Sequence, residues 1–148
     1  MTERGKRGFE DLDAYKLALQ VVKEAYRVAK SLPDEEKYNL ASQIRRAAVS
    51  ITLNIAEGYG RYHYLDSLRF YYIARGSLEE VLSAFIVCNE LGYIKSTLPE
   101  QRKLCGNAVR ALNGYIRYVQ RQKQGSREYG ERSIQEEPAS YDADSTDS

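Results

Sequence analysis

The stretch Ser42–Arg61, SQIRRAAVSITLNIAEGYGR, is the most informative part of this chain. At 100° per residue it predicts a helix with apolar residues on two opposite faces. The first face gathers Leu40, Ile44, Ala47, Ala48, Ile51 and Ile55. Val49, Leu53 and Ala56 lie almost directly across from it. A surface helix of a small monomer needs one apolar stripe, so we expect another subunit or helix layer to bury the second face.

A polar seam runs between the two apolar faces of this helix. It consists of Gln43, Ser50, Asn54, Glu57 and Arg61, with Arg46 at its border. Together with Val49, Leu53 and Ala56, we expect these residues to form an oligomer interface or a structural seam. Arg75 and Ser77 are the expected partners on the next helix, and Glu57 can pair with Arg61 four residues on. The lone carboxylate supplies no acid/base pair, which argues against an active site.

The same segment carries a family resemblance. Gln43–Arg61 matches Q-[IL]-R-R-A-x-x-S-I-x-x-N-I-A-E-G-x-G-R, which resembles the signature of the 23S rRNA intervening-sequence proteins, a family of bacterial four-helix bundle proteins. Three further segments are similar, FEDLDAYKLA (Phe9–Ala18), LRFYYIARGSLEEV (Leu68–Val81) and NELGYI (Asn89–Ile94). The resemblance covers roughly residues 9–122. It implies an up-down four-helix bundle that assembles into a homo-oligomeric ring, typically a pentamer, but it implies no biochemical activity.

Composition favours one soluble all-α domain. The chain has 148 residues, of which 43% are hydrophobic and 29% charged, and only 3 are proline. No apolar run approaches the roughly 18 residues that a membrane span needs. The first residues, MTERGKRGFEDLD, lack the apolar region of a secretory signal. We therefore expect a cytoplasmic protein.

The cysteines and the histidine indicate no cofactor. Cys88 and Cys105 are too few for a disulfide framework, and with His63 as the single histidine they cannot build a tetrahedral zinc site within one chain. Both cysteines fall on apolar helix faces. We expect free thiols in the core, no metal and no other cofactor.

Four helices are expected, at about residues 12–32, 34–57, 65–91 and 98–122, in an antiparallel up-down bundle. The first helix has an apolar seam of Leu12, Tyr15, Leu19, Val22, Tyr26 and Ala29, with a weaker stripe of Leu17, Val21 and Val28. Asp34 is a plausible N-cap of the second helix. Thr97-Leu98-Pro99-Glu100 predicts a capping box for the fourth. Gly92 is the expected stop of the third.

The third and fourth helices each have an apolar seam at the same spacing of three and four residues. The seam of the third consists of Tyr71, Ala74, Leu78, Val81, Phe85 and Cys88. That of the fourth consists of Leu98, Cys105, Ala108, Leu112, Tyr115 and Val119.

Charge divides the chain into a basic body and an acidic tail. Residues 1–125 carry a net charge of about +6 and residues 126–148 about −5, counted from their Lys, Arg, Asp and Glu. We assign residues 1–11 to an N-terminal arm, 12–124 to the bundle and 125–148 to a disordered acidic tail, because the tail has almost no aliphatic content.

The fourth helix carries a basic stripe of Lys103, Arg110, Arg117 and Arg121, within about 40° on the helical wheel. No acidic residue follows Glu100 in this helix, so these cations lack partners one turn away. Repeated around a ring, they would bind phosphates with little base specificity. The alternatives are that the stripe is a solvated face, or that it pairs with glutamates of a neighbouring helix.

A second candidate is the aromatic and basic run Tyr59–Tyr64, YGRYHY. Exposed tyrosines beside arginines can stack unpaired bases. Packing at the bundle end or at a subunit boundary is the alternative, and the preferred one.

We consider three hypotheses for the function. The leading hypothesis is a non-catalytic oligomeric bundle that binds structured nucleic acid through the basic stripe. RNA is the more plausible ligand, and DNA is the other possible one. The alternative is a protein–protein scaffold or adaptor with no nucleic-acid role. The third, an RNA-processing enzyme, has no support from the residues.

Overall fold

The computed structural model describes residues 8–129 and is all-α, with no strand in that part of the chain. It contains four long helices, α1 (Asp13–Ser31), α2 (Leu40–Tyr59), α3 (Tyr64–Glu90) and α4 (Pro99–Gln122). The short elements are the 3₁₀ turns η2 (Gly8–Asp11) and η3 (Asp34–Glu36) and the single-turn helix α5 (Ser126–Tyr129). The expectation of four helices is confirmed, and none of them is long and apolar enough to cross a membrane.

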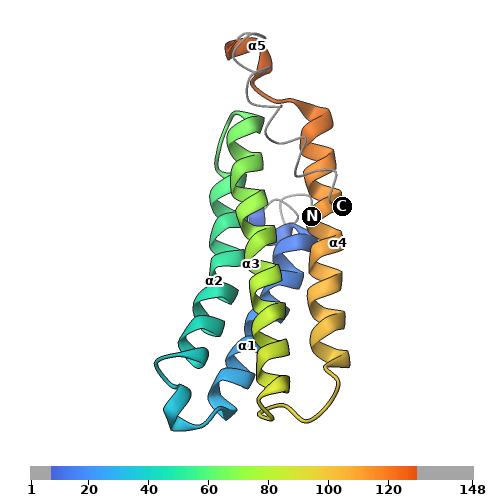
Figure 1. Cartoon of the computed structure of the whole chain (residues 1–148). Coiled ribbons are helices and arrows are strands. Elements are labelled where there is room, and N and C mark those ends of the chain that lie inside the picture. The colour runs from blue at the N-terminus through green and yellow to red at the C-terminus, as the bar shows by residue number, and fades with distance from the viewer. Residues whose placement is uncertain (1–7, 130–148) are drawn as a thin grey trace.

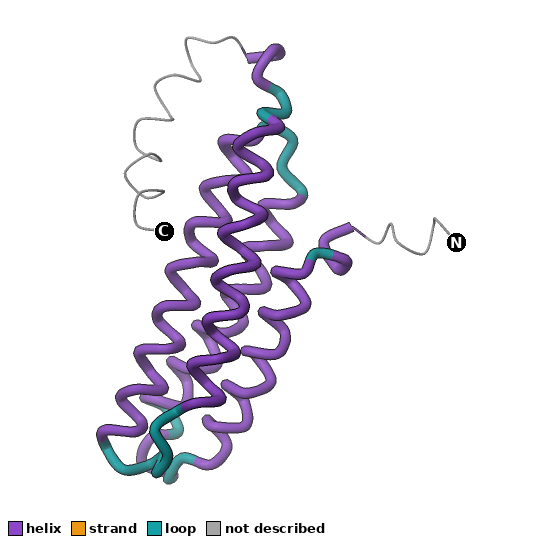
Figure 2. The backbone as a smooth tube through the Cα atoms, turned by 90° about the vertical axis from the view of Figure 1, so that its right-hand side faces the viewer, coloured by secondary structure: helices purple, strands orange, loops and turns teal. Residues whose placement is uncertain are grey.

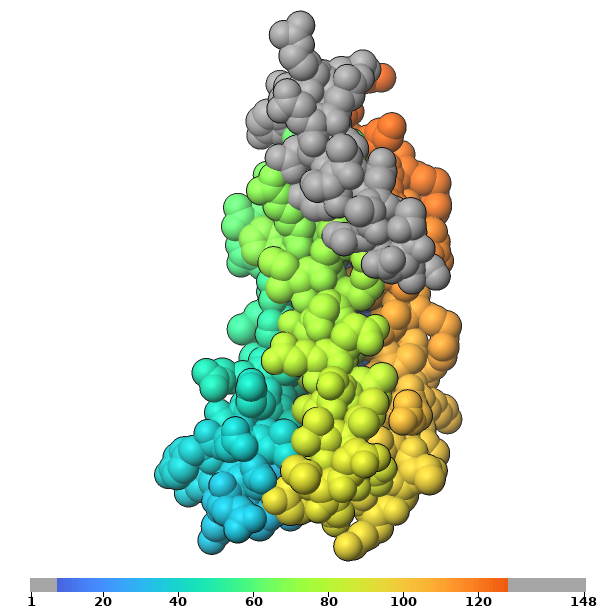
Figure 3. Space-filling model, viewed as in Figure 1, coloured from blue at the N-terminus to red at the C-terminus, as the bar shows by residue number. Residues whose placement is uncertain are grey.

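The four long helices form an elongated bundle in which loops at alternating ends join consecutive helices (Figure 1). α1 packs between α2 and α4, and α3 packs between the same two helices on the other side of the core. The space-filling view shows α3 and α4 side by side along one face (Figure 3). Each helix therefore has one face in the core, two flanks against neighbours and one outer face.

The core combines bulky side chains on α2 and α3 with small ones on α1. Ile44, Ile51 and Ile55 of α2 and Tyr71 and Phe85 of α3 are at most 1% exposed. The predicted seam of α3 is confirmed, because all its members are buried: Tyr71, Ala74, Leu78, Val81, Phe85 and Cys88. α4 contributes Cys105, Ala108, Leu112 and Ile116.

The predicted seam of α1 is wrong at Leu19 and Tyr26, which are 38% and 46% exposed. Of its other members, Ala29 is buried, and Leu12, Tyr15 and Val22 are partly buried against the core. The fully buried residues of α1 are Ala14, Ala18, Val21, Ala25, Val28 and Ala29, so two residues of the stripe predicted to be weaker lie inside. The prediction favoured the large apolar residues, but interiors are packed to a density that leaves no spare volume. With aromatic rings already in the core, α1 fits with its small residues inward. Its large residues lie outside the centre of the core.

Two predicted helix caps are also wrong. Asp34 opens the turn η3, and α2 begins only at Leu40, after Asn39. Leu98, not Thr97, precedes α4, with a left-handed backbone and no side-chain capping hydrogen bond. Burial explains the second case, because Leu98 is 1% exposed and its packing outweighs the capping preference. The stop at Gly92 is confirmed by its φ of 85°.

At both ends of the described region, short helical elements lie in segments that the sequence predicts to be an arm or a disordered tail. η2 lies within the arm assigned to residues 1–11, and α5 occupies the first part of the segment for which the sequence predicts disorder. Residues 1–7 and 130–148, which hold the rest of the arm and most of the acidic tail, lie outside the described residues.

Both cysteines are buried free thiols, as predicted. Burial raises the pKa of Cys88 to about 11 and that of Cys105 to about 12. Because the thiolate is the reactive form, these are inert structural thiols at neutral pH.

Gly58 allows α2 and α3 to approach closely. A Cβ added there would lie 2.6 Å from Cε1 of Tyr71 and 3.0 Å from the backbone oxygen of Ser67. We expect Gly58→Ala to lower the free energy of unfolding in urea by about 1–3 kcal/mol, since the buried ring cannot move aside.

Gly76→Ala is the matched control, because an added Cβ there meets nothing within 4 Å. It should raise the stability by up to about 1 kcal/mol, the usual gain of alanine over glycine in a helix. Equal stability of the two variants would contradict the close-contact explanation.

Candidate nucleic-acid interface

The basic stripe of α4 points straight away from the core. Lys103, Arg110, Arg117 and Arg121 are all exposed, and on the helical wheel they lie opposite the buried residues of α4. The first three are seven residues apart, which places them at intervals of about 10 Å along the helix. The stripe is therefore a straight row of accessible cations.

These cations have no carboxylate partner among residues 8–127, whose side chains the structure describes. The ion pairs found there join Arg27 to Glu24 and Arg61 to Glu57. Arg110 donates to the side-chain oxygen of Asn107, 2.5 Å away, which orients the guanidinium but leaves its charge uncompensated. The sequence leaves open that the stripe pairs with glutamates of a neighbouring helix. No such ion pair is found in this region.

Charge is distributed unevenly over the bundle. α1 carries four basic and two acidic residues, and α4 carries five and one. α3 has two basic and four acidic residues. Because α1 and α4 are neighbours, one side of the bundle is positive while α3 is negative. An anionic ligand is accordingly attracted to the α1/α4 side.

The polar seam of α2 lies outside the core and reaches α3 at two places, through the hydroxyl of Ser50 and through the backbone oxygen of Arg61, which accepts from the Ser67 hydroxyl at 3.3 Å. The hydroxyls of Ser50 and Ser77 are 3.0 Å apart, as the expected pairing with Ser77 requires. Asn54 donates back to the backbone and side-chain oxygens of Ser50. Glu57 and Arg61 form the expected ion pair at 2.7 Å. Gln43 and Arg46 are exposed.

Arg75 does not join this seam, contrary to expectation. Its guanidinium donates to Oδ1 of Asn113 on α4 at 2.8 Å and lies 5.0 Å from the ring centre of Tyr72. On the helical wheel Arg75 and Ser77 are about 160° apart, so they face different neighbours. The sequence pattern places Arg75 and Ser77 in the same segment of α3, but it does not show which side of the helix faces α2 and which faces α4.

The second apolar face of α2 is left uncovered by the rest of the described chain. Leu53 is 63% exposed, and Val49 and Ala56 are half-buried. Leu53 and Val49 line a shallow pocket of about 450 Å³ together with Tyr26 and Arg46. The second apolar face of α2, which the sequence predicts to form an interface, is therefore accessible to another molecule.

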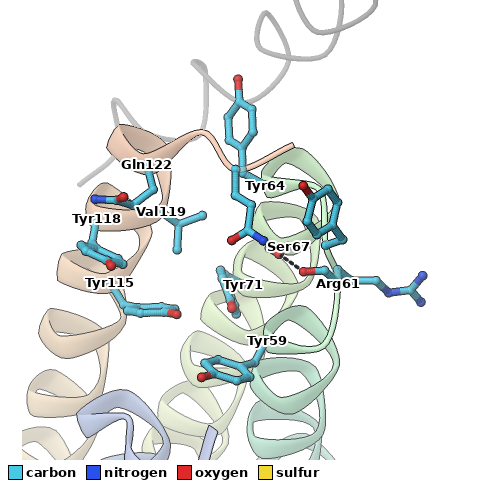
Figure 4. A pocket seen from close by; sticks show the side chains of 11 residues that line it. Tyr59, Arg61, Tyr64, Ser67, Tyr71, Tyr115, Tyr118, Val119 and Gln122 are labelled. Carbon is cyan, nitrogen blue, oxygen red and sulfur yellow. Dashed lines mark hydrogen bonds between the residues drawn. The ribbon is translucent and has the colours of Figure 1, made fainter. Parts of the chain in front are cut away.

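A pocket of about 540 Å³ lies at the end of the bundle where α2 ends and α3 begins (Figure 4). Six tyrosines line it, Tyr59, Tyr62, Tyr64, Tyr71, Tyr115 and Tyr118. Arg61, Ser67, Gln122 and Gln124 supply polar groups. The run YGRYHY thus forms one side, with packed members such as Tyr64 and half-exposed members such as Tyr59 and Tyr62.

The α4 side of this pocket is not evident from the sequence. Tyr115 points across the pocket toward Tyr71, with ring centres 5.5 Å apart, and Tyr118 stacks on Tyr115 at 5.7 Å (Figure 4). Helical periodicity places Tyr115 in the apolar seam of α4 and gives Tyr118 no role. The available signal was the recurrence of tyrosine near the ends of three helices.

His63, which lies in sequence between the pocket-lining Tyr62 and Tyr64, has a structural role. It is buried, precedes the first residue of α3, and its Nδ1 accepts a hydrogen bond of 3.2 Å from the backbone of Leu65. Among the described residues, no group of three or more His, Cys, Asp and Glu side chains could hold a metal ion.

Burial in the pocket floor raises the pKa of the Tyr71 hydroxyl, and the neighbouring Tyr115 adds to the rise. In the unfolded chain a tyrosine ionises near pH 10. The folded protein keeps a proton that the unfolded chain releases, so the free energy of unfolding should fall as the pH rises above about 10. Tyr71→Phe should weaken this fall in urea denaturation series between about pH 8 and 11.

Tyr38→Phe, in a loop and 87% exposed, is the control and should keep the wild-type pH dependence. A fall in Tyr71→Phe as steep as in the wild type would show that Tyr71 does not contribute.

Comparisons with known proteins identify the family of this chain. No curated protein sequence matches the chain. The family model described as "23S rRNA-intervening sequence protein" matches residues 10–114, which is more than half of the chain and spans α1, α2, α3 and most of α4. The resemblance noted in Gln43–Arg61 therefore extends over the bundle. This chain belongs to the 23S rRNA-intervening sequence protein family.

Proposed function

We propose that this protein is a non-catalytic, homo-oligomeric bundle that binds structured nucleic acid, with RNA as the ligand, through the basic stripe of α4. The observation that carries the proposal is the row of four exposed cations opposite the core, with no carboxylate partner among the described residues. A row of this kind binds the phosphate backbone by releasing its counterions. It positions a nucleic acid without reading its sequence.

The same proposal includes assembly. In an antiparallel up-down bundle each helix has one outer face, and on α2 that face carries Leu53, Val49 and Ala56. A second copy packed against it would remove this apolar surface from water. The family resemblance favours a ring, typically of five copies. Such a ring would repeat the α4 stripe and multiply the phosphate contacts available to one ligand.

A protein scaffold is the second candidate, favoured by apolar side chains on the outer side of α3 and just beyond its end. Ile73, Val87 and Leu91 are 51%, 41% and 56% exposed. If assembly leaves these residues uncovered, they offer a surface for another protein. The acidic character of α3 makes this side a poor one for nucleic acid.

Reversing the stripe tests nucleic-acid binding. The variant changes Lys103, Arg110, Arg117 and Arg121 to Glu, and fluorescence anisotropy follows a labelled rRNA hairpin and a matched DNA duplex at several salt concentrations. The wild type should lose affinity steeply with salt. The variant should bind at least about 100-fold more weakly at low salt, and its salt slope should be smaller by roughly one for each phosphate that it no longer neutralises.

A charge-matched control changes Lys16, Lys23, Lys30 and Lys37 to Glu, which are all exposed and lie outside the stripe; the three on α1 contribute to the general attraction of anions to the α1/α4 side but are not part of the row of cations on α4. It should keep most of the affinity. Equal loss in both variants would indicate a net-charge effect, and absence of wild-type binding at low salt would overturn the proposal.

Leu53→Glu tests the assembly. A charge in the middle of a buried apolar interface is costly, so this variant should shift toward the monomer mass in light scattering coupled to size-exclusion chromatography. Leu91→Glu, which changes a similarly exposed leucine outside this face, should keep the wild-type mass. An unchanged mass for Leu53→Glu would exclude the outer face of α2 as the interface.

A further inference from the structure

The tyrosine-lined pocket lies at an end of the bundle that α1 does not reach. α1 has 19 residues, against 20 in α2, 27 in α3 and 24 in α4. Both ribbon views show α1 beginning well below the end at which α2, α3 and α4 are joined or finish (Figures 1 and 2). Three helices therefore surround the place that a longer α1 would fill. Side chains from all three line the pocket that remains.

The pocket has an aromatic floor and an accessible aromatic rim. Tyr64 and Tyr71 are 6% and 1% exposed, so they are fixed by packing. Tyr59, Tyr62 and Tyr118 are 42%, 51% and 48% exposed. Packing alone accounts for the buried rings and does not account for three half-exposed ones around the same opening. Such rings can still cover the face of a flat ligand.

Polar groups are placed where they can contact the edge of such a ligand. The side chains of Gln122 and Gln124 are exposed at the pocket, and their amides both donate and accept hydrogen bonds. The backbone oxygen of Gln124 accepts from the backbone nitrogen of Tyr64 at 3.0 Å, which ties the segment after α4 to the start of α3. An aromatic surface with amides beside it suits a nucleobase.

The rim of the pocket and the basic stripe share the last turns of α4. Tyr118 follows Arg117 directly and precedes Arg121 by three residues, less than one helical turn. A phosphate held by Arg117 or Arg121 would bring its own nucleotide to the opening. The pocket volume of about 540 Å³ lies within the usual range of small-ligand sites, about 300–1,000 Å³.

We propose that this pocket receives one unpaired base of the RNA held by the stripe, and that Tyr118 stacks on it. This inference rests on the proposed nucleic-acid binding and assigns the ligand a structural feature, a bulged or looped-out base. Stacking is tolerant of base identity, because every base has a π-face. The pocket would thus select for local structure in the RNA, which the stripe alone cannot do.

The test uses two RNA hairpins with the same stem. One carries a single bulged 2-aminopurine, and the other has the same base paired within the stem. The wild type should bind the bulged hairpin about tenfold more tightly and quench its 2-aminopurine fluorescence, as stacking on an aromatic ring requires. Tyr118→Ala should remove both effects and leave the affinity for the paired hairpin and its salt dependence unchanged.

Two variants serve as controls. Tyr118→Phe keeps the aromatic face and should retain the preference, whereas Tyr38→Ala removes a more exposed tyrosine that does not line the pocket and should change nothing. Because Tyr118 is half-exposed, its replacement should not disturb folding, which urea denaturation would verify.

The outcomes separate the two proposals. Equal affinity of the wild type for both hairpins, with strong salt dependence and no quenching, overturns the base pocket and leaves the stripe intact. A bulge preference that survives Tyr118→Ala also overturns it. If neither hairpin binds at low salt, the proposed function and the pocket inference both fail.

Discussion

The structure depends on the burial of one apolar face from each of four helices in a single core. A side chain's direction on a helix is fixed by its position, so burying one face determines what every other residue faces. With Leu112 and Ile116 inward, Arg110 and Arg117 must point into solvent. With Ile51 and Ile55 of α2 inward, Leu53 must lie outside. Both proposed surfaces, one basic and one apolar, are consequences of the same core.

The place where α1 begins has a second effect. Because α1 begins short of this end of the bundle, no fourth helix closes it, and tyrosines from α2, α3 and α4 surround the opening (Figures 1 and 4). Gly58 allows Tyr71 to pack closely against α2, and Gly125 brings the chain after α4 back against His63. The pocket and the stripe thus meet at one end of α4.

Where sequence reasoning failed, local preference yielded to packing. The predicted seam of α1 consists mostly of its largest apolar residues, yet the fully buried positions hold alanines and two valines, because Tyr71 and Phe85 already occupy the centre of the core. Leu98 precedes α4 in a left-handed conformation because its side chain is needed inside. In both places the deciding factor was the volume left by residues distant in sequence, which no local pattern records.

The sequence by itself determined the four helices, the buried seam of α3, the outward direction of the α4 stripe and the family, because periodicity, turn residues and the spacing of motifs are local properties of the chain. The tertiary structure alone decided which face of α1 is inside, that Arg75 bonds to Asn113, and that Tyr118 joins tyrosines of α2 and α3 in one pocket. These depend on which helices become neighbours and on how far each extends, and packing among all four settles both.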